Sequence, residues 1–205
     1  MIRKILPLLL VLTGFMLASC KDYGKVEQGR TVAFDADKSV VTIIVDNNID
    51  PKKQPNYMTL PTHDYALPTD KMDRGADPTP GLRINLDVDG KTITMYNPAT
   101  KDFEKLSIEV VKDDKNIELQ RRHPLVWDAS TRKAIKFPQV NAENKTIVIY
   151  SQRQSRVTTI KLSDADFAKY KTDDWAAGDE VRIYYREQGK SLRFMNITKT
   201  DISRR

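Results

Sequence analysis

The middle of this sequence alternates strictly between apolar and polar side chains. Over residues 82–88 (LRINLDV) every second residue is apolar, which is the pattern of a β-strand with one face against a core. Asp89-Gly90 follows, and a second β-type run occupies residues 91–96 (KTITMY). An Asp-Gly pair between two such runs predicts a β-hairpin with a type I′ turn, in which both central residues have positive φ.

Runs of the same kind recur at short intervals along the chain, which is typical of β-barrels and sandwiches. They occupy residues 41–45, 106–112, 133–137, 145–151, 156–162, 180–187 and 191–199. One short helix is expected at residues 163–170, because Ser163 can cap it and Asp166 stands at the capping-box position. We therefore predict an all-β, antiparallel fold: an OB-like, partly closed β-barrel with one short helix.

Residues 47–81 are the exception to this pattern. They hold six of the ten prolines in the chain, and proline neither donates to a β-ladder nor favours a helical predecessor. Long loops without regular structure are uncommon inside compact domains and are often functional. Because Tyr57, Leu60 and Tyr65 lie within this loop, we expect it to pack across the barrel.

Two of the predicted strands share a motif. The pattern K-T-I-x-x-Y occupies residues 91–96 and recurs at residues 145–150, 54 positions later. The similarity has two interpretations: a coincidence between similar strands, or a duplicated β-meander. Duplication would make residues 82–140 and 141–205 two similar halves of one domain.

The first nineteen residues have the pattern of a leader peptide. A short basic segment precedes a mainly apolar run at residues 5–16. This run is shorter than the roughly 18 apolar residues of a membrane-spanning helix and fits the core of a signal peptide. Leu17-Ala18-Ser19-Cys20 then matches the lipobox, where a lipid is attached to the cysteine before cleavage. Cys20 is the only cysteine, and lipidation would remove a free thiol from an oxidising compartment.

These features predict three segments: residues 1–19 as a cleaved signal helix, residues 20–30 as a tether, and residues 31–205 as a single β domain. Diacylglycerol on Cys20, with further acyl chains such as palmitate, would anchor the mature chain to a membrane. Lys21 follows the cysteine where a common inner-membrane retention signal has Asp, which favours the outer membrane. The predicted location is the periplasmic side of the cell envelope.

The charge balance does not indicate a nucleic-acid partner. The chain carries 34 basic and 28 acidic residues, a net charge of +6, and loss of the two basic residues of the leader leaves +4. Both signs are interspersed, and no basic tract of five or more residues occurs. The expected partners are the lipid bilayer, through acylated Cys20, and another envelope protein.

None of the common catalytic or cofactor motifs occurs. His63 and His123 are the only histidines, and neither has a nearby set of metal ligands in the sequence. No serine lies in a G-x-S-x-G nucleophile context. Asp35 and Asp87 begin fragments of calcium loops, but neither completes the required ligand spacing. We therefore expect no cofactor, no metal and no catalytic residue.

Arginine and tyrosine gather near the C-terminus. Arg182, Tyr184 and Arg186 would share one side of the penultimate strand, and Arg153 and Arg156 flank the turn between two earlier strands. Such a basic-aromatic face can bind oligosaccharides, anionic lipid headgroups or single-stranded nucleic acid. The alternative is that these long cationic side chains only cover apolar surface.

The C-terminal third resembles small OB-like β-barrel domains of exported bacterial proteins. It carries the pattern W-x-x-G-D-E-V-x-I-x-Y at residues 175–185. This resemblance implies that Gly178-Asp179 makes a tight turn into a strand and that Trp175 packs beneath it. As a whole, the chain resembles a family of lipoproteins of similar length from Gram-negative bacteria, built on a domain of unknown function. That resemblance implies a lipid anchor and a β fold but no activity.

Together these observations predict a membrane-anchored, non-enzymatic lipoprotein that binds or scaffolds another envelope component. The first alternative is a hydrolase acting on glycan or peptide, with its site under loop 47–81, where His63 or His123 would meet carboxylates. The second alternative is oligosaccharide or nucleic-acid binding on the basic-aromatic face.

Overall fold

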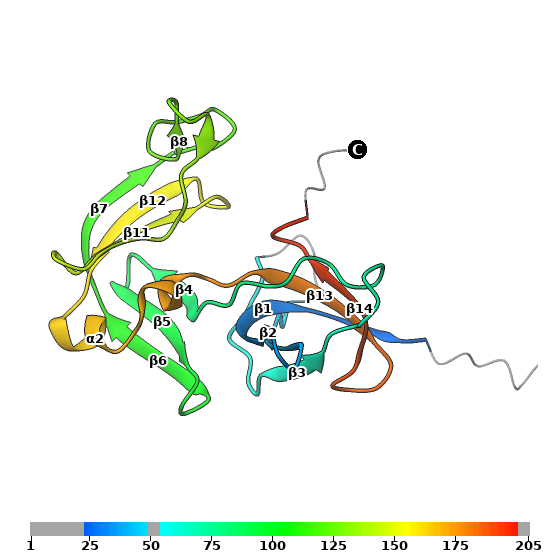
Figure 1. Cartoon of the computed structure of the whole chain (residues 1–205). Coiled ribbons are helices and arrows are strands. Elements are labelled where there is room, and N and C mark those ends of the chain that lie inside the picture. Colours follow the sequence, from blue (N-terminus) through cyan, green and yellow to red (C-terminus); the bar gives the residue numbers. More distant parts are fainter. Residues whose placement is uncertain (1–22, 49–53, 201–205) are drawn as a thin grey trace, which may run out of the picture.

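The computed structural model describes residues 23–48 and 54–200 (Figure 1). Within these residues the chain is mostly β, with several antiparallel sheets and one short α-helix. The predicted all-β class is therefore confirmed. The signal helix, the cleavage motif Leu17-Ala18-Ser19 and Cys20 lie outside the described residues.

Strands from both ends of the chain share one five-stranded sheet. Its strands, in spatial order, are β14 (Ser191–Asn196), β13 (Glu180–Tyr185), β1 (Lys25–Asp35), β2 (Val40–Val45) and β3 (His63–Ala66). The sheet curls strongly, because the rings of Tyr65 on β3 and Tyr185 on β13 lie 5.1 Å apart although two strands separate them. Ala66 forms a single bridge to Lys190, so the two sheet edges approach each other without a continuous ladder.

Two smaller sheets form the other part of the molecule. One has three strands: β4 (Arg83–Asp87), β5 (Thr92–Asn97) and β6 (Asp102–Ser107). The other has four, in the order β10 (Gln139–Asn141), β11 (Thr146–Ser151), β12 (Arg156–Lys161) and β7 (Glu109–Lys115). A two-stranded ribbon, β8 (Trp127–Asp128) with β9 (Lys133–Ala134), lies in the connection from β7 to β10.

The two segments with the K-T-I-x-x-Y motif are the central strands of these sheets. The two sheets have the same strand register, offset by 54 residues. Adding 54 to the residue numbers that pair β5 with β6 gives the pairing of β11 with β12. The same offset converts the pairing of β5 with residues 85–87 of β4 into the pairing of β11 with β10. Lys91 and Lys145, which precede the central strands, both have positive φ, 49° and 53°. Their carbonyls accept hydrogen bonds from the amides of Ile108 and Leu162 respectively. The shared sequence motif thus corresponds to a shared register.

The sheets do not follow the division into residues 82–140 and 141–205. β13 and β14 belong to the five-stranded sheet, and β7 pairs with β12 across that division. The described residues also form no closed barrel. The strands form a curled five-stranded sheet and separate smaller sheets in place of one closed barrel.

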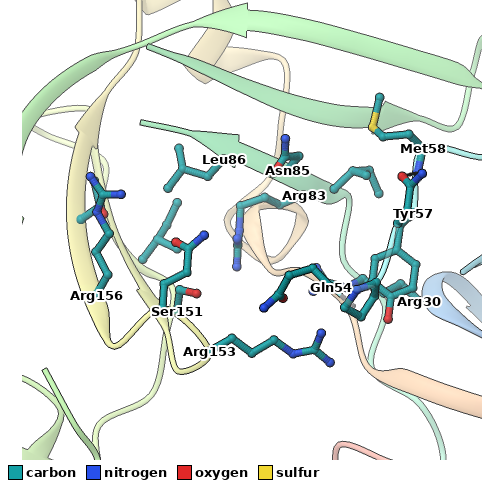
Figure 2. A pocket seen from close by; sticks show the side chains of 16 residues that line it. Arg30, Gln54, Tyr57, Met58, Arg83, Asn85, Leu86, Ser151, Arg153 and Arg156 are labelled. Atoms are coloured by element: carbon teal, nitrogen blue, oxygen red, sulfur yellow. Dashed lines mark hydrogen bonds between the residues drawn. The ribbon is translucent and has the colours of Figure 1, made fainter. Parts of the chain in front are cut away.

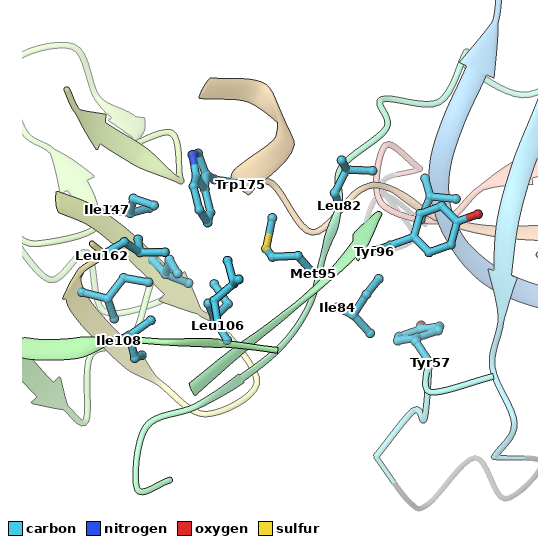
Figure 3. Close-up of a cluster of buried hydrophobic side chains, with 14 of the residues drawn as sticks. Tyr57, Leu82, Ile84, Met95, Tyr96, Leu106, Ile108, Ile147, Leu162 and Trp175 are labelled. Atoms are coloured by element: carbon cyan, nitrogen blue, oxygen red, sulfur yellow. The ribbon is translucent and has the colours of Figure 1, made fainter. Parts of the chain in front are cut away.

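One hydrophobic core joins the five-stranded sheet to the smaller sheets (Figure 3). Val32 enters this core because a bulge between Thr31 and Ala33 shifts the register of β1. Trp175 is fully buried in it and lies against the rings of Phe167 and Tyr170. A second core fills the inside of the curled sheet, built from residues Val41, Ile43, Tyr65, Leu67, Val181, Ile183, Tyr185 and Phe194.

The short helix α2 (Asp164–Ala168) lies where the sequence predicts it. Ser163 is its N-cap, and its hydroxyl oxygen accepts a hydrogen bond from the Asp166 amide at 3.1 Å. A 3-10 turn, η2 (Thr172–Trp175), follows and leads the chain back toward β13.

The turn between β4 and β5 differs from the prediction. The type I′ prediction is wrong, because neither Asp89 nor Gly90 has positive φ. The residue with positive φ is Lys91. The Asp87 carboxylate accepts a hydrogen bond from the Gly90 amide at 2.8 Å, which stabilises a four-residue turn with the left-handed residue at its end. An Asp-Gly pair is therefore compatible with more than one hairpin geometry.

Two predicted loops contain regular structure. Residues 25–30 of the expected tether form the first half of β1. Loop 47–81 contains β3, and its Tyr57, Tyr65 and Leu67 are buried, so the described part of this loop packs against the sheets. No helix in the described part of the chain has the length and hydrophobicity needed to cross a bilayer.

Candidate anion-binding cleft

A cleft of about 380 Å³ lies between the five-stranded sheet, β4 and the β11–β12 hairpin (Figure 2). One wall comes from residues 54–58 of the proline-rich loop. Four arginines line the cleft, together with uncharged polar and apolar side chains. The arginines are Arg30, Arg83, Arg153 and Arg156.

Arg30 projects from the outward face of β1. Its guanidinium carbon lies 4.6 Å from the centre of the Tyr57 ring, a cation–π contact that fixes its position. Burial, and then the nearby Glu180 carboxylate, raise the pKa of Tyr57. The Tyr57 hydroxyl has no hydrogen-bond partner among the described residues. Tyr57 therefore places a buried hydroxyl beside a cation.

Arg83 begins β4 and lies deeper in the cleft. Its Nε donates a hydrogen bond to the Trp175 carbonyl at 3.0 Å. Burial, and to a smaller extent the positive charge of Arg30, together lower the pKa of Arg83 to about 10. The pKa of a guanidinium group normally lies well above this value. The buried position of Arg83 is therefore unfavourable for its positive charge.

Arg30 and Arg83 are not neutralised by the protein. Within residues 23–48 and 54–200, no carboxylate forms an ion pair with either guanidinium. Glu180 is the cross-strand neighbour of Arg30, but its two oxygens contact Gln28 and Arg153 instead. Buried charges are usually paired, so this arrangement leaves room for an external anion.

Arg153 closes one side of the cleft from the turn between β11 and β12. It donates to Glu180 at 3.3 Å, and Gln28 donates to the other oxygen of Glu180 at 2.6 Å. Arg182 in turn donates to the amide oxygen of Gln28 at 2.9 Å. A chain of hydrogen bonds thus connects Arg153 to Arg182, two residues of the predicted basic-aromatic face.

The other members of that face are placed differently. Tyr184 lies beside Arg182 on the outward side of β13, and Arg186 follows the end of β13 and is exposed. Arg156 lines the cleft but forms a two-pronged ion pair with Asp113 on β7, with an Nη2–Oδ2 distance of 2.7 Å. Arg156 therefore stabilises a sheet and is not free to bind a ligand.

The sequence does not identify Arg30, Arg83 and Tyr57 as site residues. Arg83 occupies a polar position in the alternating run 82–88, where it is expected to face solvent. The three residues come from separate parts of the chain and meet only through tertiary packing. The proline content of loop 47–81 was the one usable signal, because that loop supplies Tyr57.

The two histidines also lie apart. His63 Nδ1 lies 2.8 Å from a carboxylate oxygen of Glu27 on β1. The same carboxylate accepts hydrogen bonds from the hydroxyls of Tyr65 and Tyr185, at 2.8 and 2.7 Å. His123, in contrast, accepts a hydrogen bond from the Leu125 amide inside a turn. The hydrolase hypothesis requires a histidine in contact with a carboxylate, and of the two histidines only His63 makes such a contact.

Burial alone would raise the pKa of Glu27, but the hydrogen bonds from His63, Tyr185 and Tyr65 outweigh burial and leave it lowered. The Glu27 carboxylate is thus held in its charged form by three donors. Among the described residues, no group of three or more His, Cys, Asp or Glu side chains is arranged to hold a metal ion.

Residues 22–205 match a protein family described as a domain of unknown function (DUF4881). No curated protein and no solved structure matches the chain.

Proposed function

The chain belongs to the DUF4881 family, and from the site itself we propose that it is a lipid-anchored, non-enzymatic envelope protein that binds an acidic sugar unit in the arginine cleft. The observation that carries this proposal is the pair Arg30 and Arg83, two guanidinium groups that face one cavity without a carboxylate partner in the described chain. Guanidinium groups bind carboxylate and phosphate through paired, charge-assisted hydrogen bonds.

The rest of the lining supports a sugar as the carrier of the negative charge. The side-chain amides of Gln54 and Asn85 make no hydrogen bond within the described chain, so both can bind hydroxyl groups. Met58 and Leu86 offer apolar surface to the ring of a sugar. The volume of about 380 Å³ lies within the range of roughly 300–1,000 Å³ that small-ligand sites occupy.

The membrane anchor is the second part of the proposal. The lipobox at Leu17-Ala18-Ser19-Cys20 supports attachment of acyl chains to Cys20 and a location on the periplasmic side of the envelope, with the outer membrane favoured. A protein held there meets glycans and glycolipids that carry carboxylate or phosphate. Binding such a unit would connect the anchored protein to another envelope component.

Titration calorimetry on the protein purified in detergent tests the proposal. Glucuronate and glucose 6-phosphate present a carboxylate and a phosphate on similar rings, inorganic phosphate presents the anion alone, and glucose presents the uncharged ring. We expect one or both acidic sugars to bind, inorganic phosphate to bind more weakly, and glucose not to bind.

The matched variants are Arg83→Gln and Arg121→Gln. Arg83→Gln removes one charged hydrogen-bond donor, each of which contributes about 1.5–3 kcal/mol, so the affinity should fall about 10- to 100-fold. Arg121 is exposed and pairs only with Glu118, so its replacement should leave affinity unchanged. Equal affinity for glucose and glucuronate would overturn the proposal.

A hydrolase acting on glycan or peptide is the second candidate. The contact between His63 Nδ1 and Glu27 favours it, because a carboxylate that orients an imidazole is part of many acid–base sites. This candidate predicts turnover of a glycan or peptide substrate that is lost in His63→Gln. Absence of turnover by the purified protein across envelope glycans and peptides would exclude it.

A further inference from the structure

The outward face of the five-stranded sheet carries a group of exposed apolar and cationic side chains near the start of β1. Val26 on β1 pairs with Tyr184 on β13, which pairs with Arg193 on β14. Residues that pair across antiparallel strands share one face of the sheet. Val181 and Ile183 point to the buried inside of the curl, so this row lies on the outside.

The apolar members of this face are unusually exposed. Val26 is 59% exposed, Leu192 is 45% exposed, and Tyr23, just before β1, is 91% exposed. Tyr184, Leu192 and Arg193 also line a shallow groove together with Asp73. Tyrosine is enriched at the level of lipid headgroups, where its ring is apolar and its hydroxyl is hydrated.

The charges around this group are mainly positive. Arg182 and Arg186 form no ion pair in the described part of the chain. The nearby acids are already paired, Asp73 with Arg193 at 3.3 Å and Glu187 with Lys190 at 2.9 Å. A surface of this kind is attracted to anionic lipid headgroups.

The covalent chain limits how far this face can lie from the anchor. Cys20 precedes Lys25, the first residue of β1, by five residues. A fully extended chain spans at most about 3.3–3.6 Å per residue, so the start of β1 can lie no more than about 18 Å from Cys20. Figure 1 shows the start of β1 at the end of the sheet that points away from β7, β11 and β12.

We propose that the face formed by Tyr23, Val26, Tyr184, Leu192 and the cations around them docks onto the anionic bilayer that holds Cys20. This inference rests on the lipid anchor of the proposed function and adds a defined orientation to it. The apolar side chains enter the headgroup layer, and Arg182 and Arg186 contact lipid phosphates. The smaller sheets then extend away from the membrane.

Fluorescence on the acylated protein in vesicles of phosphatidylethanolamine and phosphatidylglycerol tests this orientation. The thioether on Cys20 leaves no free thiol, so Val26→Cys, Leu192→Cys and Val111→Cys each introduce one site for an environment-sensitive label. Val111 on β7 is the matched control, because it is also an exposed valine (52%) but lies far from the start of β1. Intact mass measured beforehand establishes whether Cys20 is acylated.

We expect a nitroxide attached to the lipid headgroup to quench labels at residues 26 and 192 several-fold more strongly than a label at residue 111. High salt should weaken this difference, because it screens the cations from the headgroups. Acylated protein with equal quenching at all three sites would overturn the docking proposal and leave the anchor intact. An unmodified Cys20 would overturn both.

Discussion

Arg83→Met should make the protein more stable and at the same time weaken anion binding about 10- to 100-fold. In the native protein the pKa of Arg83 is lowered from 12.5 to about 10 by burial and by Arg30. Each tenfold change in proton affinity corresponds to about 1.4 kcal/mol, so the unpaired charge costs at most about 3 kcal/mol. Methionine has a similar length, carries no charge and packs easily in irregular spaces.

The expected net gain is smaller than this limit. The variant loses the hydrogen bond from Arg83 Nε to the Trp175 carbonyl, which contributes about 1.5 kcal/mol when the donor is charged. The free energy of unfolding should therefore rise by about 1–2 kcal/mol, which raises the Tm of a chain of this size by about 2–8 °C.

Urea unfolding at neutral pH, followed by tryptophan fluorescence, measures this change directly. Arg121→Met is the matched control, because that exposed arginine pairs only with Glu118, and its replacement should change stability by no more than about 0.5 kcal/mol. A decrease of 1 kcal/mol or more in the free energy of unfolding of Arg83→Met would refute the reasoning. It would mean that the guanidinium group stabilises the fold in the absence of a ligand.

Two further substitutions test contacts within and beside the five-stranded sheet. Glu27→Gln should destabilise the protein by about 2 kcal/mol at pH 7, since its carboxylate accepts three hydrogen bonds. The folded-state pKa of Glu27 is lowered, so this stability is present above the unfolded-state pKa and is lost as the pH falls through the folded-state pKa. The difference in urea midpoint between the native protein and Glu27→Gln should therefore shrink below about pH 4. The control variant Glu143→Gln, at an exposed position, should have the same urea midpoint as the native protein at every pH. Gly178→Ala should cost more than about 1–2 kcal/mol, because Gly178 has φ of +76° and a Cβ there would lie 2.1 Å from the Thr31 carbonyl oxygen; an unchanged urea midpoint would contradict that.

Local features of the fold could be predicted from the sequence because they depend on neighbouring residues. The alternation at residues 82–88 gives β4, and Ser163 with Asp166 gives the cap of α2. Gly178 takes positive φ before β13, and Trp175 is buried, as the W-x-x-G-D-E-V pattern implies. Each of these follows from contacts within a few residues.

Pairing between distant segments could not be predicted in the same way. β1 pairs with β13, so Gln28 and Arg182, 154 residues apart, form a hydrogen bond. The same pairing brings Glu27 to Tyr185. Alternation shows which residues are buried in a strand, but it does not show which strand lies beside it.

The candidate cleft depends on such distant contacts. Arg153 was predicted as a binding residue and does line the cleft, whereas Arg156 is neutralised by Asp113. A single sequence contains no information on which arginines find a carboxylate. Arg30 and Arg83 are distinguished because both line the cleft and neither forms an ion pair with a carboxylate in the described structure.

A crystal structure of the protein with glucuronate or glucose 6-phosphate tests the central claim most directly. We expect the carboxylate or phosphate within hydrogen-bonding distance of the guanidinium groups of both Arg30 and Arg83, with the sugar ring toward Met58 and Leu86. An acidic sugar bound elsewhere, or a cleft that stays free of it at saturating concentration, would contradict the account.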